Sequence, residues 1–237
     1  GAPSFVHDVD FDGRGSFVVT SNTGVFQWRN GNWIALGSPP ALTTRIAITP
    51  HGGLFVVNTG FYGLTGTQWS YLNLPSSGDC VALPDGRLAV TDPSGGGGAA
   101  PRVYLYTPGS PTLQWQALGS PSALDDWVFA IAEMPNGDLV IGGDFSLGNR
   151  VDRWDGSSWQ AMGAGFDDRV EQLHVCSDGR VLALGSFTAS GSVACAGAAI
   201  WNGTTWEALS SPELLLRNAV AHPNGDFWAV TRNGRLA

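Results

Sequence analysis

The sequence predicts an all-β fold, a six-bladed β-propeller of four-stranded antiparallel blades whose last blade lacks part of its pattern. Three observations lead to this prediction. A β-hairpin signal recurs six times, paired tryptophans flank a second recurrent turn, and no segment has helical periodicity.

The hairpin signal is a tight turn followed by an apolar run. Its six glycines are Gly15, Gly53, Gly86, Gly137, Gly179 and Gly225. Four of them follow Asn or Asp, and both dipeptides favour a hairpin because their residues tolerate positive φ. The repeat length is close to that of a propeller blade, roughly 40 residues.

The second signal is a pair of tryptophans around another turn. Complete copies run over 28–33, 154–159 and 201–206, and partial copies end at Trp69 and Trp115. Because one antiparallel meander cannot bury both of its faces, the blades must stack. We therefore expect the Trp rings to lie as plates between neighbouring sheets.

The two signals interleave into one unit of four strands, which predicts a single propeller domain. The expected blades cover 5–43, 44–77, 78–124, 125–166, 167–213 and 214–237, the last together with N-terminal residues. The sixth repeat begins a third strand at Arg235 and has no Trp-bearing fourth strand. Either residues outside this chain complete it, or the last blade has three strands.

One repeat carries a resemblance to a known family. The stretches Pro135-Asn136-Gly137-Asp138-Leu139-Val140-Ile141-Gly142-Gly143-Asp144-Phe145 and Trp154-Asp155-Gly156-Ser157-Ser158-Trp159 resemble the kelch-like propeller repeats of large secreted bacterial proteins. The resemblance implies a propeller and an extracellular or cell-surface location, with the periplasm as the alternative. It implies no catalytic residue, because such repeats serve many functions.

Composition narrows the class of partner. The net charge of −8 argues against nucleic acid, which needs clustered basic residues. No apolar run reaches the length of a membrane span. The chain ends lead us to expect a mature protein or a piece of a longer one. Cys80, Cys176 and Cys195 lack metal-type spacing, so we expect free, packed thiols.

The first strand of each blade is expected to line a central channel. Most channel positions hold small residues, as at Ala47 and Ala130. The polar exceptions are Asp8, Asp10, Gln172 and His174. They indicate either an ion or water-chain site or simply a solvated channel.

Asp8, Asp10 and Asp12 also form an Asp-x-Asp-x-Asp-Gly stretch, the opening of a Ca²⁺ loop. A β-hairpin version of such a loop would end at Ser16 and lead into a strand. The alternative register places Asp8 and Asp10 in the channel strand. Calcium is the one cofactor that the sequence raises.

The loops between blades, and between the second and third strands, share one face and carry the predicted ligand site. Its candidates are Trp127, Asp125, Asp126, Arg45, Arg169, Arg217, Phe61, Tyr62, Asp144 and Arg150. Trp127 lies outside the repeated Trp pattern, so either it contacts a ligand or it packs on a neighbouring blade. Aromatic plates beside carboxylates and Arg suit sugar rings.

Catalysis finds little support, and no catalytic residue is assigned. The four histidines occupy different positions of the repeat, and no nucleophile elbow is present. We therefore expect a non-enzymatic binding or scaffold module of a secreted or cell-surface protein, whose partner is a protein or a glycan. The alternatives are a lectin with sugar pockets and a carbohydrate-active hydrolase or lyase.

Overall fold

The computed structural model describes residues 3, 5–12, 15–37, 45–57, 60–74, 78–92, 103–110, 115–119, 124–209, 216–221 and 227–231; it leaves the side chains of 147–148 and of the last two ranges undescribed. The chain divides into two compact units. Unit 1 is Gly1–Ser94 with Val103–Ala117, and unit 2 is Gly95–Arg102 with Leu118–Ala237.

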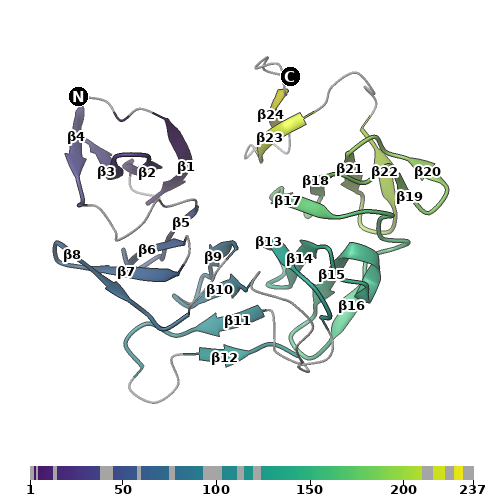
Figure 1. The fold of residues 1–237 in the computed structure, drawn as a ribbon, viewed down its shortest axis with the longest axis horizontal. Coiled ribbons are helices and arrows are strands. Elements are labelled where there is room, and N and C mark those ends of the chain that lie inside the picture. Colours follow the sequence, from purple (N-terminus) through teal and green to yellow (C-terminus); the bar gives the residue numbers. More distant parts are fainter. Residues whose placement is uncertain are drawn as a thin grey trace. The chain divides into compact units, whose positions relative to one another are not determined.

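Unit 1 contains three four-stranded antiparallel sheets, each with its strands in chain order (Figure 1). The strands are β1 (Val6–Phe11), β2 (Phe17–Ser21), β3 (Gly24–Arg29) and β4 (Asn32–Ala35); β5 (Arg45–Ile48), β6 (Leu54–Val57), β7 (Phe61–Thr65) and β8 (Gln68–Tyr71); and β9 (Cys80–Ala82), β10 (Leu88–Thr91), β11 (Val103–Tyr106) and β12 (Trp115–Ala117). The first strands are neighbours, since β1 lies against β5 and β5 against β9.

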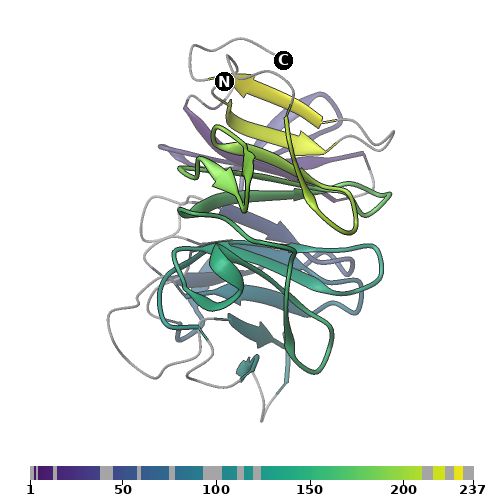
Figure 2. The same ribbon diagram turned by 90° about the vertical axis from the view of Figure 1, so that its right-hand side faces the viewer.

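Unit 2 repeats this plan, and Figure 2 shows its first two sheets stacked face to face. Its strands are β13 (Val128–Glu133), β14 (Leu139–Gly143), β15 (Val151–Trp154) and β16 (Trp159–Ala161); β17 (Val170–Val175), β18 (Val181–Gly185), β21 (Ala198–Trp201) and β22 (Trp206–Ala208); the inserted hairpin β19 (Ala189–Ser190) and β20 (Val193–Ala194); and β23 (Leu216–Ala221) with β24 (Phe227–Thr231). A 3₁₀-helix, η1 (Leu147–Arg150), precedes β15. β17 lies against both β13 and β23.

The predicted four-stranded antiparallel sheet is confirmed in five of the repeats. The last repeat has the two strands β23 and β24 among the described residues, and Arg235 lies outside them.

The first strands of the described repeats lead into hairpin turns for a local reason, although in the second repeat the glycine with positive φ is Gly52 and not the predicted Gly53, and Gly225 lies outside the described residues. In the fifth repeat the Gly179 N–H donates to the Cys176 carbonyl at 2.9 Å, and Gly179 adopts φ +86°. Asp178 accepts the Arg180 N–H at 3.0 Å and so fixes the same turn. Only a residue without Cβ enters this left-handed conformation at no steric cost, which is why the turn glycine recurs.

Several closing tryptophans lie between sheets, as predicted, and three of these also carry a hydrogen bond. The indole N–H donates to a main-chain carbonyl in the tail of the preceding sheet. Among the described residues these pairs are Trp69 to Leu36 (3.0 Å), Trp115 to Leu72 (2.8 Å) and Trp206 to Met162 (2.8 Å). Each Trp therefore joins two sheets by apolar contact and by one polar bond.

Close backbone packing explains the glycines that end β14 and β18. A Cβ on Gly143 would lie 2.0 Å from the Trp127 carbonyl oxygen, and a Cβ on Gly185 would lie 2.2 Å from that of Arg169. At both places the register of the first strand shifts by one residue, which is a β-bulge.

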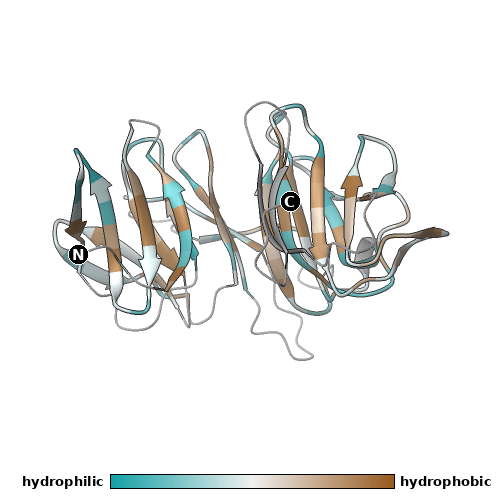
Figure 3. Ribbon diagram, turned by 90° about the horizontal axis from the view of Figure 1, so that it is seen from above, coloured by the Kyte–Doolittle hydropathy of each residue, from teal (hydrophilic) through white to brown (hydrophobic). Residues whose placement is uncertain are grey.

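The cores lie between the stacked faces of the sheets. In unit 2, Phe166 and Phe187 stack with ring centroids 4.0 Å apart, and Trp206 packs on Phe166. In unit 1, Phe55 and Phe61 stack in the same way. Figure 3 shows the hydrophobic residues along the strands and hydrophilic residues in several of the turns.

Candidate functional site

A repeated tripeptide precedes the first strands of two blades in unit 2. It reads Asp125-Asp126-Trp127 before β13 and Asp167-Asp168-Arg169 before β17. The second Asp accepts the N–H of the residue that follows it, at 2.9 Å for Asp126 and 2.7 Å for Asp168. The two blades thus present the third residue, Trp or Arg, at equivalent places.

The first Asp of the tripeptide holds the loop between the second and third strands. Asp125 accepts the Ser146 N–H at 2.8 Å and its hydroxyl, and Asp167 does the same with Thr188. These hydrogen bonds lower the pKa of both carboxyls. Asp125 was predicted to bind ligand; the structure instead shows its carboxylate occupied by the loop that it organises.

Trp127 projects from the loop end of β13 with 42% of its surface exposed. Its ring packs against Phe129 with centroids 5.7 Å apart and an interplanar angle of 75°. In the next blade the equivalent pair is ionic, because Arg169 Nε lies 2.9 Å from Glu171 Oε1. Since β13 lies against β17, an aromatic pair and an ion pair occupy neighbouring strand ends.

The β-bulges produce this arrangement. Phe129 and Glu171 are the extra residues in β13 and β17, and a bulge turns such a residue out of the regular pleat. Trp127 and Arg169 could be picked out from the sequence, but these two partners were missed, because a bulge has no local sequence signal as strong as the Asn-Gly turn.

Asp144 and Arg150 lie in the loop that follows β14, near the loop end of β13 that carries Trp127. The Asp144 N–H donates to the Trp127 carbonyl at 2.8 Å, and Arg150 Nε lies 3.2 Å from Asp144 Oδ1. Asp144 therefore lies beside the main chain of Trp127, and Arg150 is paired with Asp144. We define Trp127, Phe129, Asp144, Arg150, Arg169 and Glu171 as the loop-end patch.

Two aromatic candidates of unit 1 behave differently. Phe61 is 0% exposed and packs on Phe55, Tyr106 and Trp115, so its assignment to a ligand-binding surface was wrong. Phe61 is the first residue of β7, and its side chain lies on the face of that strand that packs into the core. Tyr62, the next residue, points the other way and packs on Tyr71.

A line of charge crosses the first strands of unit 1. Arg45 begins β5 instead of lying free in a loop, and its Nε is 3.2 Å from Asp79 Oδ1. Asp8 Oδ2 accepts the Ile46 N–H at 2.9 Å, so Asp8 binds the same strand from the other side. Burial raises the pKa of Asp8 to about 6, although the charge of Arg45 opposes that rise.

The carboxylates of the expected calcium loop are spread along β1 and the turn after it. Asp10 accepts the Ile48 N–H at 2.8 Å, and Asp12 accepts the Ser16 N–H at 3.0 Å. Burial raises the pKa of Asp10. Over the described ranges no group of three or more acidic, His or Cys side chains is placed to hold a metal ion.

The remaining channel positions divide into two kinds. Gln172 and His174 lie side by side on β17, with Oε1 and Nε2 3.4 Å apart. Ala47 and Ala130 are instead buried in the cores between sheets. Their assignment to an open channel was wrong, because strand side chains project toward the stacked neighbouring sheets and not along the strand edge.

The three cysteines are free and buried, as predicted. The side chain of Arg217 lies outside those that the structure describes. In the part of the chain that the structure describes, no helix has the length and hydropathy to cross a membrane.

Comparison with known proteins identifies the fold. No family model and no curated protein matches the sequence. Among solved structures, virginiamycin B lyase from Staphylococcus aureus superposes with a TM-score of 0.70 at 11% identity, over 98% of this chain and 78% of that one. YCF48 bound to D1 peptide gives 0.63 at 15% identity, over 98% and 76%.

A third similar structure is the extracellular domain of the putative hybrid two component system BT4673 from B. thetaiotaomicron. Its TM-score is 0.64 at 12% identity, over 98% of this chain and 32% of that one. These neighbours are β-propeller proteins, so the chain has a β-propeller fold. At such identities the likeness shows the fold alone.

Proposed function

We propose that this chain is a binding or scaffold module of a secreted or cell-surface protein, built as a six-bladed propeller of kelch-like repeats, and that it contacts a protein or glycan partner through the loop-end patch. An extracellular domain and a peptide-bound propeller are among its structural neighbours, which supports a binding role outside the cytoplasm.

The observation that carries the proposal is the exposed indole of Trp127. Blade packing does not require it, because the equivalent residue of the next blade is Arg169. A rigid aromatic side chain surrounded by polar groups is typical of the few residues that dominate binding energy at interfaces. Arg150, Arg169 and the nearby carboxylates supply hydrogen-bonding partners around it.

The test is binding to a glycan array and to a peptide array, with Trp127→Ala as the variant. Loss of a large interfacial aromatic costs about 2 kcal/mol or more, so binding should weaken by about thirtyfold. Tyr71→Ala is the matched control, since Tyr71 is 45% exposed and packs on an aromatic neighbour as Trp127 does. Equal binding by Trp127→Ala and the wild type would contradict the proposed site.

A carbohydrate-active hydrolase or lyase is the second candidate. Asp8 favours it, because a carboxyl with a pKa of about 6 beside Arg45 has the properties of a general acid or base. A lyase is among the structural neighbours. Product release from a polysaccharide panel, abolished by Asp8→Asn, would support the enzyme and would contradict a purely non-enzymatic module.

A further inference from the structure

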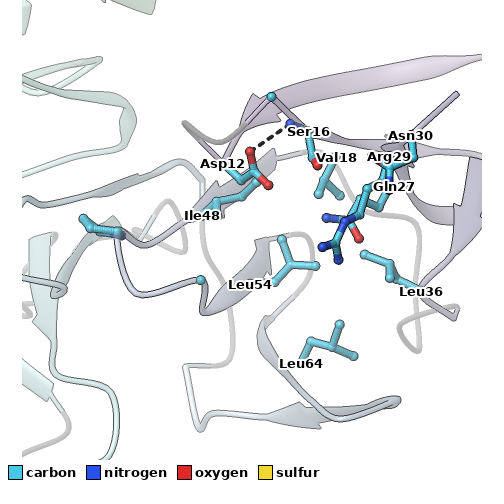
Figure 4. Close-up of a pocket in the computed structure, with 13 residues that line it drawn as sticks. Asp12, Ser16, Val18, Gln27, Arg29, Asn30, Leu36, Ile48, Leu54 and Leu64 are labelled. Carbon is cyan, nitrogen blue, oxygen red and sulfur yellow. Dashed lines mark hydrogen bonds between the residues drawn. The ribbon is translucent and has the colours of Figure 1, made fainter.

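A second site lies in unit 1, between the sheet β1–β4 and the sheet β5–β8. It is a pocket of about 420 Å³ at the turn ends of the strands (Figure 4). Leu36, Leu54 and Leu64 form its apolar wall, and Asp12, Gln27 and Arg29 line its polar side. Its volume is that of a site for a small molecule.

The pocket exists because blade 2 departs from the repeat. Leu64 pairs with Trp69 as Trp154 pairs with Trp159 and Trp201 with Trp206. Leu64 therefore occupies the position where the complete repeats carry their first tryptophan.

In unit 2 that tryptophan fills the space against the preceding sheet. Trp201 comes within 3.1 Å of the place where a Cβ on Gly163 would stand. Leu64 is shorter than an indole, so the corresponding space beside Leu36 stays open.

Arg29 brings a positive charge to this space, and Asp12 lines the opposite side of the same pocket. Seven arginines have described side chains; six form ion pairs with Asp or Glu, and Arg29 forms none. At the position of Arg29 the fourth blade has Asp155, which accepts N–H bonds from Ser157 and Ser158 and so closes its own turn.

Blade 1 does not need a polar residue for its turn. Asn30 and Gly31 adopt φ +52° and +78°, which closes a two-residue turn without side-chain help. Arg29 is therefore free of the structural role of Asp155. Figure 4 shows its guanidinium and the Gln27 amide directed into the space above the leucines, with Asp12 on the opposite side, where it binds the Ser16 N–H.

We propose that this pocket binds a small organic carboxylate with an apolar body. The carboxylate accepts hydrogen bonds from Arg29 and Gln27, and the apolar body covers Leu36, Leu54 and Leu64. A guanidinium binds a carboxylate through charge-assisted, often bidentate bonds, which a neutral hydroxyl cannot match. Asp12 repels a second anionic group, so the ligand carries its charge at one end.

The experiment uses the 237-residue chain and two probes, sodium octanoate and 3-phenylpropionate, in calorimetric titrations. The corresponding alcohols are the ligand controls. We expect saturable binding of at least one carboxylate below about 10 mM and at least about tenfold weaker binding of its alcohol. No saturable heat from either carboxylate would overturn the proposal.

Two variants locate the binding. Arg29→Gln should weaken carboxylate binding about tenfold or more, and Leu64→Trp should abolish it by restoring the indole of the repeat. Arg87→Gln is the matched control, because Arg87 is paired with Asp85 in a turn outside the pocket. Unchanged binding by Arg29→Gln would overturn the proposal, whether or not Leu64→Trp folds. A loss of loop-end binding in Trp127→Ala with intact carboxylate binding would separate the two sites.

Discussion

Asp152 makes the stability of this protein depend on pH in a direction unusual for a carboxyl. The residue lies in β15, is 1% exposed, and accepts the Arg153 N–H at 3.1 Å. Burial raises its pKa from 3.8 to about 6, and the hydrogen bond offsets only part of that rise. The folded protein therefore favours the protonated form more than the unfolded chain does.

Proton linkage determines whether stability rises or falls with pH. The stabilising effect of the protonated carboxyl is fully present below pH 3.8 and is lost as pH rises through 6. A rise from 3.8 to about 6 is worth about 3 kcal/mol in total. About 2 kcal/mol of this falls between about pH 4.5 and 7.5.

Asp152→Asn removes the charge and keeps the shape of the neutral acid. Urea unfolding of the variant and the wild type should give free energies of unfolding that differ by about 2 kcal/mol more at about pH 7.5 than at 4.5, in favour of the variant. Asp8 also has a raised pKa, but it is partly exposed and is present in both proteins, so it cancels in the difference. If the free energies of unfolding of the variant and the wild type changed equally with pH, the proposed role of Asp152 would be refuted.

Three further substitutions test the packing. Gly143→Ala places a methyl group 2.0 Å from the Trp127 carbonyl oxygen and should lower the free energy of unfolding by at least about 2 kcal/mol in urea melts, whereas a neutral effect would argue against the bulge. Trp206→Phe leaves the Met162 carbonyl without its donor and should cost about 1–3 kcal/mol; an unchanged melting temperature would show that the hydrogen bond is dispensable. Asp125→Ala should increase hydrogen exchange in the loop after β14 with little effect on the core strands, and uniform exchange rates would contradict a local role.

The blade pattern could be predicted because its signals are local. A turn at Gly179 depends on Asp178 and on the backbone within four residues, and the sequence shows all of these together. The Trp pairs are equally local, and their spacing reports the paired strands. Both signals recur, so one weak copy does not hide the repeat.

It is harder to predict which residues of an individual strand face the core. Phe61 and Tyr62 are neighbours in β7, and a shift of one residue exchanges which of them is buried. The third strand of that blade has no Trp to mark its register, since Leu64 stands there. The assignment of Phe61 to the surface failed for this reason.

The β-bulges are a second feature that could not be predicted from the sequence. Phe129 and Glu171 reach the loop-end patch because the carbonyls of Trp127 and Arg169 approach glycines on the adjacent strand. That approach is a contact across the sheet, so no residue within the first strand reports it. The Gly-Gly pair at 142–143 was visible in the sequence, but its meaning depends on which strand lies beside it.

The two proposed sites share one origin in the repeat. Stability is distributed over positions that recur from blade to blade, such as the turn glycine and, in the five complete sheets, the closing indole, and each blade is held by its neighbours. A blade can therefore change a position of the pattern without losing the fold. Leu64 opens a pocket where the complete repeats carry an indole, at Trp28, Trp154 and Trp201, and Trp127 stands where the next blade has Arg169. Departures from the repeat are thus the positions where binding is best sought in this chain, because the packing of the shared residues already accounts for the rest.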